Sequence, residues 1–482
     1  MTPAQIRLLD ALAGTLPARA IVTDRDVIAP LETDWRGRWR GHAPLLFLPG
    51  STAEVSAIVA AAAAIRVPLV PQGGNTSMVG GATPPADGSA AILSTRRMNA
   101  IRRLDADAGL VVAEAGLILS DLHVAALGVG RRFPLSLGAK GSAMVGGLVS
   151  TNAGGTQVLR FGTMRGLVAG IEAVLPDGQV HEGLAALKKD NRGYDLTQLL
   201  IGGEGTLGVV TAATLRLVPA IAARAVAWVG LADPVAALAL LRRFQAASED
   251  VESFELLPAE SLGAVLRHIP GTRAPLAGEH PWHALIEVTA ADAAREPPAA
   301  LIERVLAAAL ADGLVADATI AASEAQADAF WRIRESISEA ERATGPAAQH
   351  DISVPVEAMP RFMIEAAAAC EARFPGSSAS GFGHLGDGNV HFHVRAPAGV
   401  DAQRWFAEEA PVVTRFVDDL VVAAGGSISA EHGIGQMKLG ELERLSSRAR
   451  MTALRAIKAA LDPHGIMNPG KLVTLARGGA GE

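Results

Sequence analysis

The sequence predicts an α+β protein of two or three domains, each combining short strands with a few helices. The chain has 482 residues, which is more than one hydrophobic core normally serves. Short strand patterns alternate with a few helical ones before Pro219, and helices are interleaved with strands after it. We therefore expect four segments: an N-terminal helix and loop over residues 1–40, a domain over 41–219, a second domain over 220–440 and a C-terminal segment over 441–482.

The elements of the first domain follow from local signals. Ser51 and Glu54 have the spacing of a capping box, which opens an apolar helix running to about Arg66. A short strand follows over residues 67–70. Further along, a Pro-Asp-Gly turn within residues 171–180 predicts a hairpin.

The second domain shows longer helical patterns between strands. Helices are predicted over residues 301–310 and 402–424, and Gly425 ends the second of them. Strands are predicted over residues 283–288 and 389–394. This arrangement is typical of an α+β domain that covers a substrate.

The composition narrows the class of protein. Hydrophobic residues make up 49% of the chain, and 43 basic against 50 acidic residues give a net charge of −7. This mild charge predicts no surface for nucleic acid. The single cysteine, Cys370, excludes a disulfide within the chain and is typical of a reducing compartment, so we expect a cytoplasmic protein. We expect no signal peptide and no membrane span, because the apolar runs are short or interrupted.

The first of three glycine-rich blocks follows the strand over residues 67–70. It reads Pro-Gln-Gly-Gly-Asn-Thr-Ser over residues 71–77, with Gly80 and Gly81 behind it. Such glycines let backbone N–H groups converge on an anion, and the Asn, Thr and Ser side chains add further donors. Alone, the pattern fits a turn-rich surface loop equally well.

Two further blocks favour a cofactor site. Residues 134–155 are rich in glycine, contain no acidic residue and carry a single charge, Lys140. A long uncharged segment of small residues indicates backbone packed closely against a large ligand. Residues 202–208 form the third block and lead into a strand over 209–218. We interpret the three blocks as the walls of one elongated cofactor site.

A histidine-rich stretch in the second domain predicts a metal site. After Gly388 the residues have a strand pattern, so alternation places Asn389, His391 and His393 on one face of the strand. His384 enters from the glycine-rich loop before this strand.

Glu431 and His432, about forty residues further on, complete the set. Together with His384 and His391, Glu431 gives two nitrogen ligands and one oxygen ligand, which suits a catalytic divalent metal with open positions. His432 would then be a free base beside the metal. The alternative interpretation is a turn with unrelated histidines.

Six motifs together resemble a known family. They are PQGGNTSMVGG, LGAKGSAMVGGLVSTNAGG, GGEGTLGVVT, GFGHLGDGNVHFH, ISAEHGIG and MNPGK. In this order they resemble the FAD-linked 2-hydroxy-acid dehydrogenases of the vanillyl-alcohol-oxidase fold. D-2-hydroxyglutarate dehydrogenases are the most similar members, and D-lactate dehydrogenases and the glycolate oxidase flavin subunit are further relatives. The resemblance covers roughly residues 40 to 475.

The resemblance implies an FAD-binding domain of the vanillyl-alcohol-oxidase type, an α+β substrate cap and a C-terminal segment that returns to the FAD domain. We expect non-covalent FAD, because the glycine-rich blocks contain no His or Cys. The positions that correspond to FAD contacts are Gln72, Gly73, Gly74, Asn75, Thr76, Ser77, Pro134, Leu137, Gly138, Ser142, Gly146, Gly147, Asn152, Ala153, Gly154, Gly208, Val209, Val210 and Asn468.

The resemblance also assigns roles to the metal-site residues. It implies that His384, His391 and Glu431 bind Zn²⁺ or another divalent metal and that His432 is the catalytic base. An imidazole suits that task because its pKa lies near working pH.

For the substrate, the resemblance points to Arg334 as the residue that grips a carboxylate, with Ser338 nearby. Two positions differ from the hydroxyglutarate dehydrogenases. Gln349 replaces a lysine, and His393 replaces an asparagine. These differences put a dicarboxylic substrate in question, while the redox chemistry is unaffected.

The predicted reaction is oxidation of a D-2-hydroxy acid to the 2-oxo acid, with hydride transfer to flavin N5. D-2-hydroxyglutarate is the preferred substrate by resemblance, and D-lactate dehydrogenase or a glycolate oxidase-type flavin subunit is the alternative. The resemblance further implies an electron-transfer flavoprotein or a quinone as acceptor, and a homodimer. Two other classes stay open: a zinc hydrolase with His432 as base, and a flavin-binding subunit without turnover.

Overall fold

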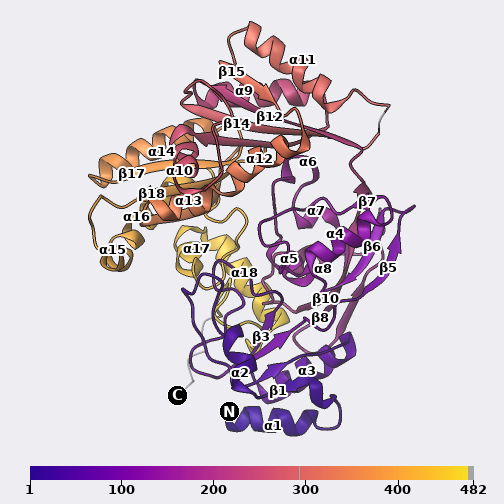
Figure 1. Ribbon diagram of the computed structural model, residues 1–482. Helices are drawn as coiled ribbons and strands as arrows, with labels where there is room; N and C mark the ends of the chain where they lie inside the picture. The colour runs from indigo at the N-terminus through magenta and orange to yellow at the C-terminus, as the bar shows by residue number, and fades with distance from the viewer. Residues whose placement is uncertain (293, 476–482) are drawn as a thin grey trace. The chain divides into compact units, whose positions relative to one another are not determined.

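The computed structural model describes residues 1–292 and 294–475, which form two compact units (Figure 1). The first unit comprises Met1–Gly154, Gly162–Pro219 and the segment from Glu431 to the C-terminus, and the second comprises Gly155–Phe161 and Ala220–Ala430. No helix among the described residues is long and apolar enough to span a membrane.

The first unit contains a four-stranded sheet, a five-stranded sheet and a two-stranded ribbon, in the orders β1-β2-β4-β3, β5-β6-β10-β8-β9 and β11-β7. Its strands are β1 (Ile21–Val22), β2 (Leu46–Phe47), β3 (Leu69–Gln72), β4 (Ala91–Ser94), β5 (Ile101–Asp105), β6 (Leu110–Glu114), β7 (Arg131–Arg132), β8 (Val168–Val174), β9 (Val180–Gly183), β10 (Val209–Arg216) and β11 (Val218–Pro219). Its helices are α1 (Pro3–Leu12), η1 (Ala18–Ala20), α2 (Arg25–Ile28), η2 (Ala29–Leu31), α3 (Thr52–Ile65), α4 (Leu119–Leu127), α5 (Val145–Thr151), α7 (Met164–Leu167), α8 (Leu196–Leu200), α17 (Leu439–Leu445) and α18 (Arg448–Leu461).

Helix α3 confirms the expected helix after Ser51. The Ser51 side chain accepts a hydrogen bond from the Glu54 N–H, as an N-cap residue does. The Glu54 carboxylate accepts from Gly50 N at 2.7 Å, so the second half of the capping arrangement reaches one residue further back than expected. The helix ends at Arg66, which has a left-handed φ of 62°. The hairpin of β8 and β9 is also confirmed, with Val174 opposite Val180.

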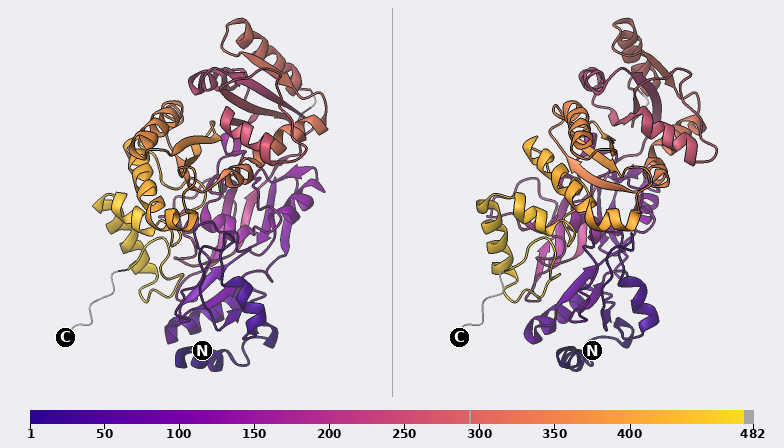
Figure 2. Two further views of the ribbon diagram at one scale, coloured as in Figure 1. Left: turned by 60° about the vertical axis from the view of Figure 1, so that its left-hand side comes forward. Right: turned by 90° about the vertical axis from the view of Figure 1, so that its left-hand side faces the viewer.

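The expected segments at the two ends of the chain are parts of the first unit. Leu8 and Leu12 of α1 share a hydrophobic core with Val55 and Ile58 of α3. The chain enters this unit again at Glu431 rather than near residue 440. Met467 forms a parallel bridge with Leu69 of β3, which places the C-terminal segment beside the N-terminal strands (Figures 1 and 2). Residues 476–482 lie outside the described residues.

The second unit is built on one seven-stranded sheet with the order β15-β12-β14-β13-β17-β18-β16. Its strands are β12 (Ala223–Leu231), β13 (Val251–Pro258), β14 (Trp282–Ala290), β15 (Asp317–Ile320), β16 (Ala347–Ser353), β17 (Ser378–His384) and β18 (Asn389–Arg395). Its helices are α6 (Val158–Phe161), α9 (Pro234–Ala247), α10 (Ala259–His268), α11 (Pro298–Ala311), α12 (Glu324–Glu335), α13 (Ile337–Thr344), α14 (Met359–Arg373), α15 (Ala402–Glu408) and α16 (Ala410–Ala423).

The two faces of this sheet differ in chemistry. One face packs against α9, α11, α14 and α16, and Val390, Phe392 and Val394 of β18 contribute to its apolar core. The other face is covered in part by apolar residues of α10, α12 and α13. The predicted alternation of β18 is therefore confirmed, and its histidines are on the face opposite to the larger core.

The single helix expected over residues 402–424 is wrong, because α15 and α16 are separate helices that meet at Glu409. Pro411 explains the break. A proline has no N–H and its ring opposes the carbonyl one turn back, so it is tolerated in the first turn of a helix but not in the interior.

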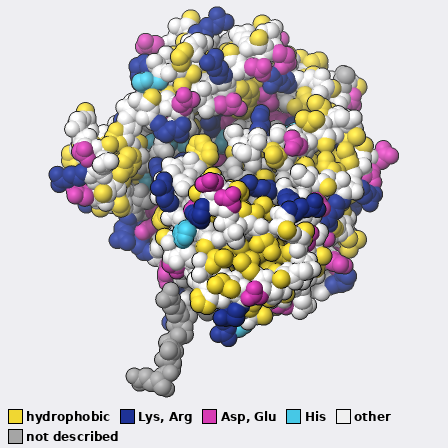
Figure 3. Space-filling view, turned by 60° about the horizontal axis from the view of Figure 1, so that its bottom comes forward, with side chains coloured by type: hydrophobic (Ala, Val, Ile, Leu, Met, Phe, Trp, Pro, Cys, Tyr) yellow, Lys and Arg dark blue, Asp and Glu magenta, His cyan; other side chains and the backbone are white. Residues whose placement is uncertain are grey.

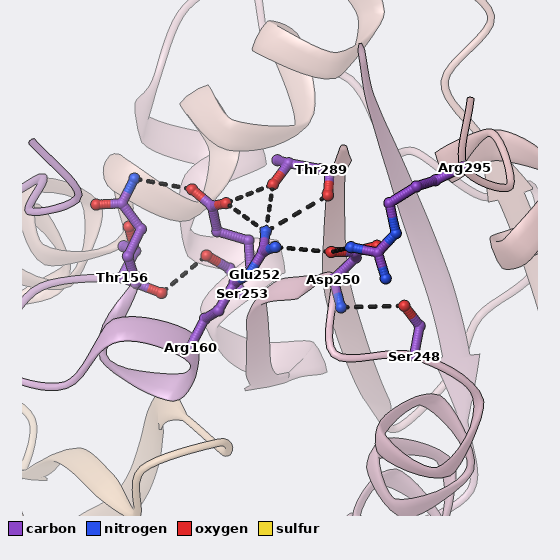
Figure 4. A network of polar contacts seen from close by, with 9 residues as sticks. Thr156, Arg160, Ser248, Asp250, Glu252, Ser253, Thr289 and Arg295 are labelled. Atoms are coloured by element: carbon purple, nitrogen blue, oxygen red, sulfur yellow. Dashed lines mark hydrogen bonds and ion pairs between the residues drawn. The ribbon is translucent and has the colours of Figure 1, made fainter. Parts of the chain in front are cut away.

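Residues 155–161 are an unexpected part of the second unit (Figure 4). Arg160 Nη2 contacts Asp250 Oδ1 at 2.7 Å, and its Nη1 donates to Thr289 Oγ1 at 2.9 Å. Gln157 Nε2 donates to Glu252 Oε1 at 3.1 Å. These half-buried polar contacts hold the end of the second glycine-rich block against β13 and β14. No local sequence pattern predicts these contacts.

Candidate functional site

Three neighbouring strands of the second unit, β16, β17 and β18, bring several of the predicted site residues to one sheet face. His391 of β18 is directly opposite Phe382 of β17 and Asp351 of β16. His384 is opposite Asn389 of β18. Because residues opposite each other on neighbouring strands share a face, the polar side chains among these lie on one face together with the Phe382 ring.

The glycines around His384 predict a loop, but His384 lies in a strand. It is the last residue of β17, and it also pairs with Glu255 of β13. The turn follows it, and Gly388 takes a φ of 79° there, which only glycine adopts readily. A Cβ at this position would lie 2.1 Å from the Val354 carbonyl oxygen.

Glu255 joins two of the predicted site residues. Its Oε1 contacts His384 Nδ1 at 2.7 Å, and its Oε2 accepts a hydrogen bond from Arg334 Nε at 2.7 Å. The Glu255 side chain is fully buried. Burial alone would raise the pKa of this carboxyl, but the neighbouring Arg334 and His384 lower the pKa below its ordinary value. A carboxylate in this setting is charged and accepts hydrogen bonds only.

The two histidines of the predicted metal set lie close together. The ring centroids of His384 and His391 are 5.7 Å apart, and the ring planes meet at 78°. His391 Nδ1 lies 3.9 Å from Asp351 Oδ1, and Asn389 Nδ2 donates to the same oxygen at 3.0 Å. Asp351 on β16 is thus a carboxylate close to His391 on β18.

The predicted third ligand and the predicted base follow directly after the second unit. Ala430, its last residue, has its N–H 3.4 Å from the carbonyl oxygen of Asp351. Glu431 and His432 are the next two residues and belong to the first unit. Both are partly exposed, and each has at least one interaction partner.

Arg334 is held so that part of its guanidinium group is available. Its Cζ lies 5.1 Å from the centre of the Phe382 ring, and its Nε is engaged by Glu255. Its Nη2 is buried and has no hydrogen-bond partner among the described residues. A buried donor without a partner is unfavourable, so the position is suited to an incoming acceptor such as a carboxylate.

Gln349 and His393, the two positions at which the family resemblance implies a different residue, lie side by side. Gln349 of β16 and Ser380 of β17 are both directly opposite His393 of β18. His393 Nδ1 is 3.7 Å from Glu341 Oε2 on α13, and Arg395 forms an ion pair with the same carboxylate. Ser338 is also on α13 but is exposed.

The first unit brings the three glycine-rich blocks together. A Cβ on Gly74 would lie 1.8 Å from the carbonyl oxygen of Ser142, so the first and second blocks touch through their backbones. The N–H of Glu204, in the third block, donates to Ser150 O in the second at 2.8 Å. Asn468 Nδ2 donates to Gly81 O at 2.9 Å and to Glu204 O at 2.7 Å.

Some of the predicted cofactor glycines are required by packing within the protein. A Cβ on Gly146 would lie 2.7 Å from the Ala115 Cβ, and one on Gly208 would lie 2.7 Å from Val174 O. In contrast, a Cβ on Gly138 or Gly147 would meet no described atom within 4 Å. The second pair therefore fits better with backbone that approaches a ligand.

The other expected cofactor positions are distributed over the same part of the first unit. Gln72 ends β3 and is buried, and its Nε2 donates to Leu31 O and Ala82 O. Asn75 has a φ of 55° and its Nδ2 donates to Thr33 O. Asn152 caps α5 with a φ of 51°. The remaining positions lie next to these or at the start of β10: Gly73, Thr76, Ser77, Pro134, Leu137, Ala153, Gly154, Val209 and Val210.

Comparison with known structures defines the class of fold. The chain matches p-cresol methylhydroxylase with a TM-score of 0.74 at 13% identity, over 98% of both chains. It matches an alkyldihydroxyacetonephosphate synthase with a TM-score of 0.70 at 16% identity, over 97% of this chain and 86% of that one. The predicted α+β flavoenzyme fold of the vanillyl-alcohol-oxidase type is therefore confirmed.

Comparison of sequences defines the family. Residues 221–472 match the model for the C-terminal domain of FAD linked oxidases, and residues 43–183 match that for an FAD binding domain. The chain is 37% identical over 459 residues to the mitochondrial D-2-hydroxyglutarate dehydrogenase of Arabidopsis thaliana, covering 95% of this chain and 80% of that protein. It is 37% identical over 463 residues to the D-2-hydroxyglutarate dehydrogenase of Xanthomonas citri pv. viticola, covering 96% of each.

The chain therefore belongs to the family of FAD-linked oxidases, and it is an FAD-binding oxidoreductase. Its relatives include several proteins named D-2-hydroxyglutarate dehydrogenase and a D-2-hydroxyglutarate–pyruvate transhydrogenase of Saccharomyces cerevisiae, 33% identical over 92% of this chain and 90% of that protein.

The roles of two buried carboxylates near the predicted residues were not predicted from the sequence. Glu255 lies in the apolar strand β13, and its partners are 129 and 79 positions away in the chain. Glu204 was seen only as part of a glycine-rich block, although it accepts hydrogen bonds from Ile434 N and Gly435 N, both at 2.7 Å. Neither role has a local signal, because both depend on contacts between distant segments.

Proposed function

We propose that this protein is an FAD- and metal-dependent dehydrogenase that oxidises a D-2-hydroxy acid to the 2-oxo acid, with D-2-hydroxyglutarate as the preferred substrate. The observation that carries the proposal is the sheet face on which Glu255 holds both His384 and Arg334. A carboxylate-binding arginine next to a pair of converging imidazoles suits a substrate with a carboxylate and an adjacent hydroxyl. The family and the names of the relatives support the same reaction.

The donor set fits a divalent cation. We propose that His384 and His391, together with Glu431, bind this cation. Because the charged Glu255 accepts from His384 Nδ1, that ring carries its proton on Nδ1 and keeps the Nε2 lone pair for a ligand bond. Nitrogen and carboxylate ligands are those of catalytic Zn²⁺ sites, and such an ion lowers the pKa of a bound hydroxyl.

The glycine-rich blocks fit FAD. Their backbones meet at Gly74 and Ser142, and glycines such as Gly147 leave room next to the main chain. When bound, FAD supplies the hydride acceptor for the C2 hydrogen of the substrate. We propose that it is held without a covalent bond, since the blocks contain neither His nor Cys.

The chain's own residues perform the remaining steps. Arg334 binds the substrate carboxylate through the amino groups that Glu255 leaves free. His432 accepts the hydroxyl proton as the hydride leaves C2, which balances the two-electron oxidation. Gln349, His393 and Ser338 line the distal part of the substrate and set its selectivity.

Several broader assignments belong to the same proposal. An electron-transfer flavoprotein or a quinone reoxidises the flavin, and the protein works as a homodimer in the cytoplasm. The single cysteine supports a reducing compartment. Several relatives are named as mitochondrial proteins, and the bacterial one is not. Charged side chains of both signs are interspersed on the face in Figure 3, which favours small-molecule over polyanionic partners.

A steady-state assay with an artificial electron acceptor tests this function. The D and L forms of 2-hydroxyglutarate, lactate and 2-hydroxybutyrate are offered, and the product is identified by mass spectrometry. We expect turnover of D acids to 2-oxo acids, fastest with hydroxyglutarate. A preference for D-lactate would favour the alternative substrate, and turnover of none would contradict the proposal.

A further inference from the structure

Glu255 is an unusual residue for the middle of a buried strand. It lies on β13 between Phe254 and Leu256, both of which pack into the larger apolar core. The Glu255 side chain has no exposed surface. Burying a charge is unfavourable unless partners satisfy it, so such a residue is expected to have a specific role.

Both oxygens of Glu255 are engaged, and each serves a different predicted function. One accepts from the ring of His384, and the other accepts from the Nε of Arg334, each at 2.7 Å. His384 arrives at the end of a neighbouring strand, while Arg334 comes from helix α12. A single carboxylate therefore joins two elements that carry two different ligands.

The contact to His384 has a direct chemical consequence. An ionised carboxylate only accepts, so His384 must donate from Nδ1 and cannot rotate without losing the bond. Carboxylates that hold a metal-binding imidazole in this way make it a better ligand and fix its orientation.

The contact to Arg334 has a consequence of the same kind. The guanidinium group is planar, so a bond at Nε fixes the directions of both terminal amino groups. Of these, Nη2 is buried and without a partner among the described residues. Phe382 limits movement on one side, because its ring centre is 5.1 Å from Cζ.

We propose that Glu255 is a positioning residue that keeps the metal-binding nitrogen of His384 and the carboxylate-binding amino groups of Arg334 in one fixed relation. The inference rests on the proposed function, since it takes His384 as a ligand and Arg334 as the partner of the substrate. Glu255 itself touches neither metal nor substrate. Its effect is to make metal affinity and substrate affinity depend on the same carboxylate.

The test compares Glu255→Gln with Glu252→Gln in the full-length, FAD-loaded protein. A glutamine can accept at its oxygen, but its NH₂ group would face a second donor, either the His384 ring or Arg334 Nε. Glu252 is a matched control. It lies on the same strand, is also fully buried and also contacts an arginine, Arg160, but it takes no part in the site.

Three quantities are measured for each protein: the melting temperature, the rate at which a chelator removes the metal, and the Kd of glutarate by calorimetry. Glutarate has the carboxylates of the substrate but no hydroxyl, so it is not oxidised. We expect both variants to melt at a lower temperature. Only Glu255→Gln should lose its metal roughly 10- to 100-fold faster, and only it should bind glutarate at least tenfold more weakly.

Arg334→Gln provides a second variant on a helix, which keeps the test open if Glu255→Gln does not fold. Without Arg334 the carboxylate of Glu255 is free to turn, so we expect the chelator to remove the metal at least threefold faster, although Arg334 is not a ligand. Unchanged metal release in this variant would overturn the inference.

Two further outcomes distinguish failure of this inference from failure of the proposed function. A wild-type protein that binds no stoichiometric metal overturns the proposed function and the inference with it. The other outcome is a wild type that contains stoichiometric metal while Glu255→Gln and Glu252→Gln release metal equally fast and bind glutarate equally well. That result overturns the inference alone. In that case Glu255 would contribute only to stability.

Discussion

Gln349 and His393 lie directly opposite each other on the neighbouring strands β16 and β18. The family resemblance implies a lysine and an asparagine at these positions in the hydroxyglutarate dehydrogenases, so the two expected differences fall at one place in the sheet. His393 is additionally close to the buried carboxylate of Glu341, at 3.7 Å. Any distal carboxylate that reaches this place meets an amide and an imidazole instead of a lysine.

The first prediction is that Gln349→Lys increases selectivity for dicarboxylic substrates. A hydrogen bond between a charged lysine and a carboxylate contributes about 1.5–3 kcal/mol, or roughly 10- to 150-fold in affinity. The ratio of kcat/KM for D-2-hydroxyglutarate to that for D-lactate should therefore rise at least tenfold. Gln245→Lys, an exposed position on α9, is the control for added charge. An unchanged ratio would mean that Gln349 does not face the distal end of the substrate.

The second prediction concerns Glu204, which holds the segment after His432 through the N–H groups of Ile434 and Gly435. Gly433 fits tightly here, because a Cβ would lie 2.8 Å from the Glu204 carboxylate. In Glu204→Gln only one of the two donors keeps an acceptor. We expect the rate of flavin reduction to fall about tenfold or more, with FAD content unchanged.

Glu172→Gln is the control for this variant, since Glu172 accepts hydrogen bonds from Thr52 and Thr211 in the same unit. Stopped-flow measurement of flavin reduction compares the two. Equal rates in both variants would show that Glu204 does not position His432.

The third prediction separates metal ligands from the base. Chelation, or alanine in place of His384, His391 or Glu431, should abolish reduction of the flavin by substrate while FAD stays bound. His432→Ala should keep both metal and FAD and lose roughly 10²–10⁴-fold in rate. Metal content by mass spectrometry is the deciding measurement, because an empty site in His432→Ala would make His432 a ligand.

The fourth prediction follows from Lys471. Burial lowers the pKa of this amine from 10.5 to about 8, with Glu204 acting in the opposite direction. Between these two pH values the unfolded chain binds more protons than the folded one, so stability from this group rises with pH. The full effect is about 3 kcal/mol.

Urea denaturation from pH 8 to pH 10.5 compares wild type with Lys471→Met. The difference in unfolding free energy should change in favour of wild type over this range. A difference that is independent of pH would mean that the folded protein does not hold Lys471 in its neutral form between pH 8 and pH 10.5.

The sequence predicted those features that depend on local pattern. The alternation along β18 placed His391 and His393 on one face, and the glycine-rich blocks indicated the FAD-binding part of the chain. It did not predict that His384 ends a strand, since the glycines around it read as a loop. The role of Glu255 could not be predicted from the sequence, because it arises only when β13 pairs with β17. No local pattern in an apolar strand predicts that pairing.

The most direct test of the proposed function is the absorption spectrum of the purified protein under anaerobic conditions. We expect a yellow protein whose flavin is fully reduced by one equivalent of D-2-hydroxyglutarate and is unaffected by the L form. Acid precipitation should release all of the flavin into solution. A colourless protein would favour a metal-dependent hydrolase, and a yellow protein that no 2-hydroxy acid reduces would contradict the proposed dehydrogenase.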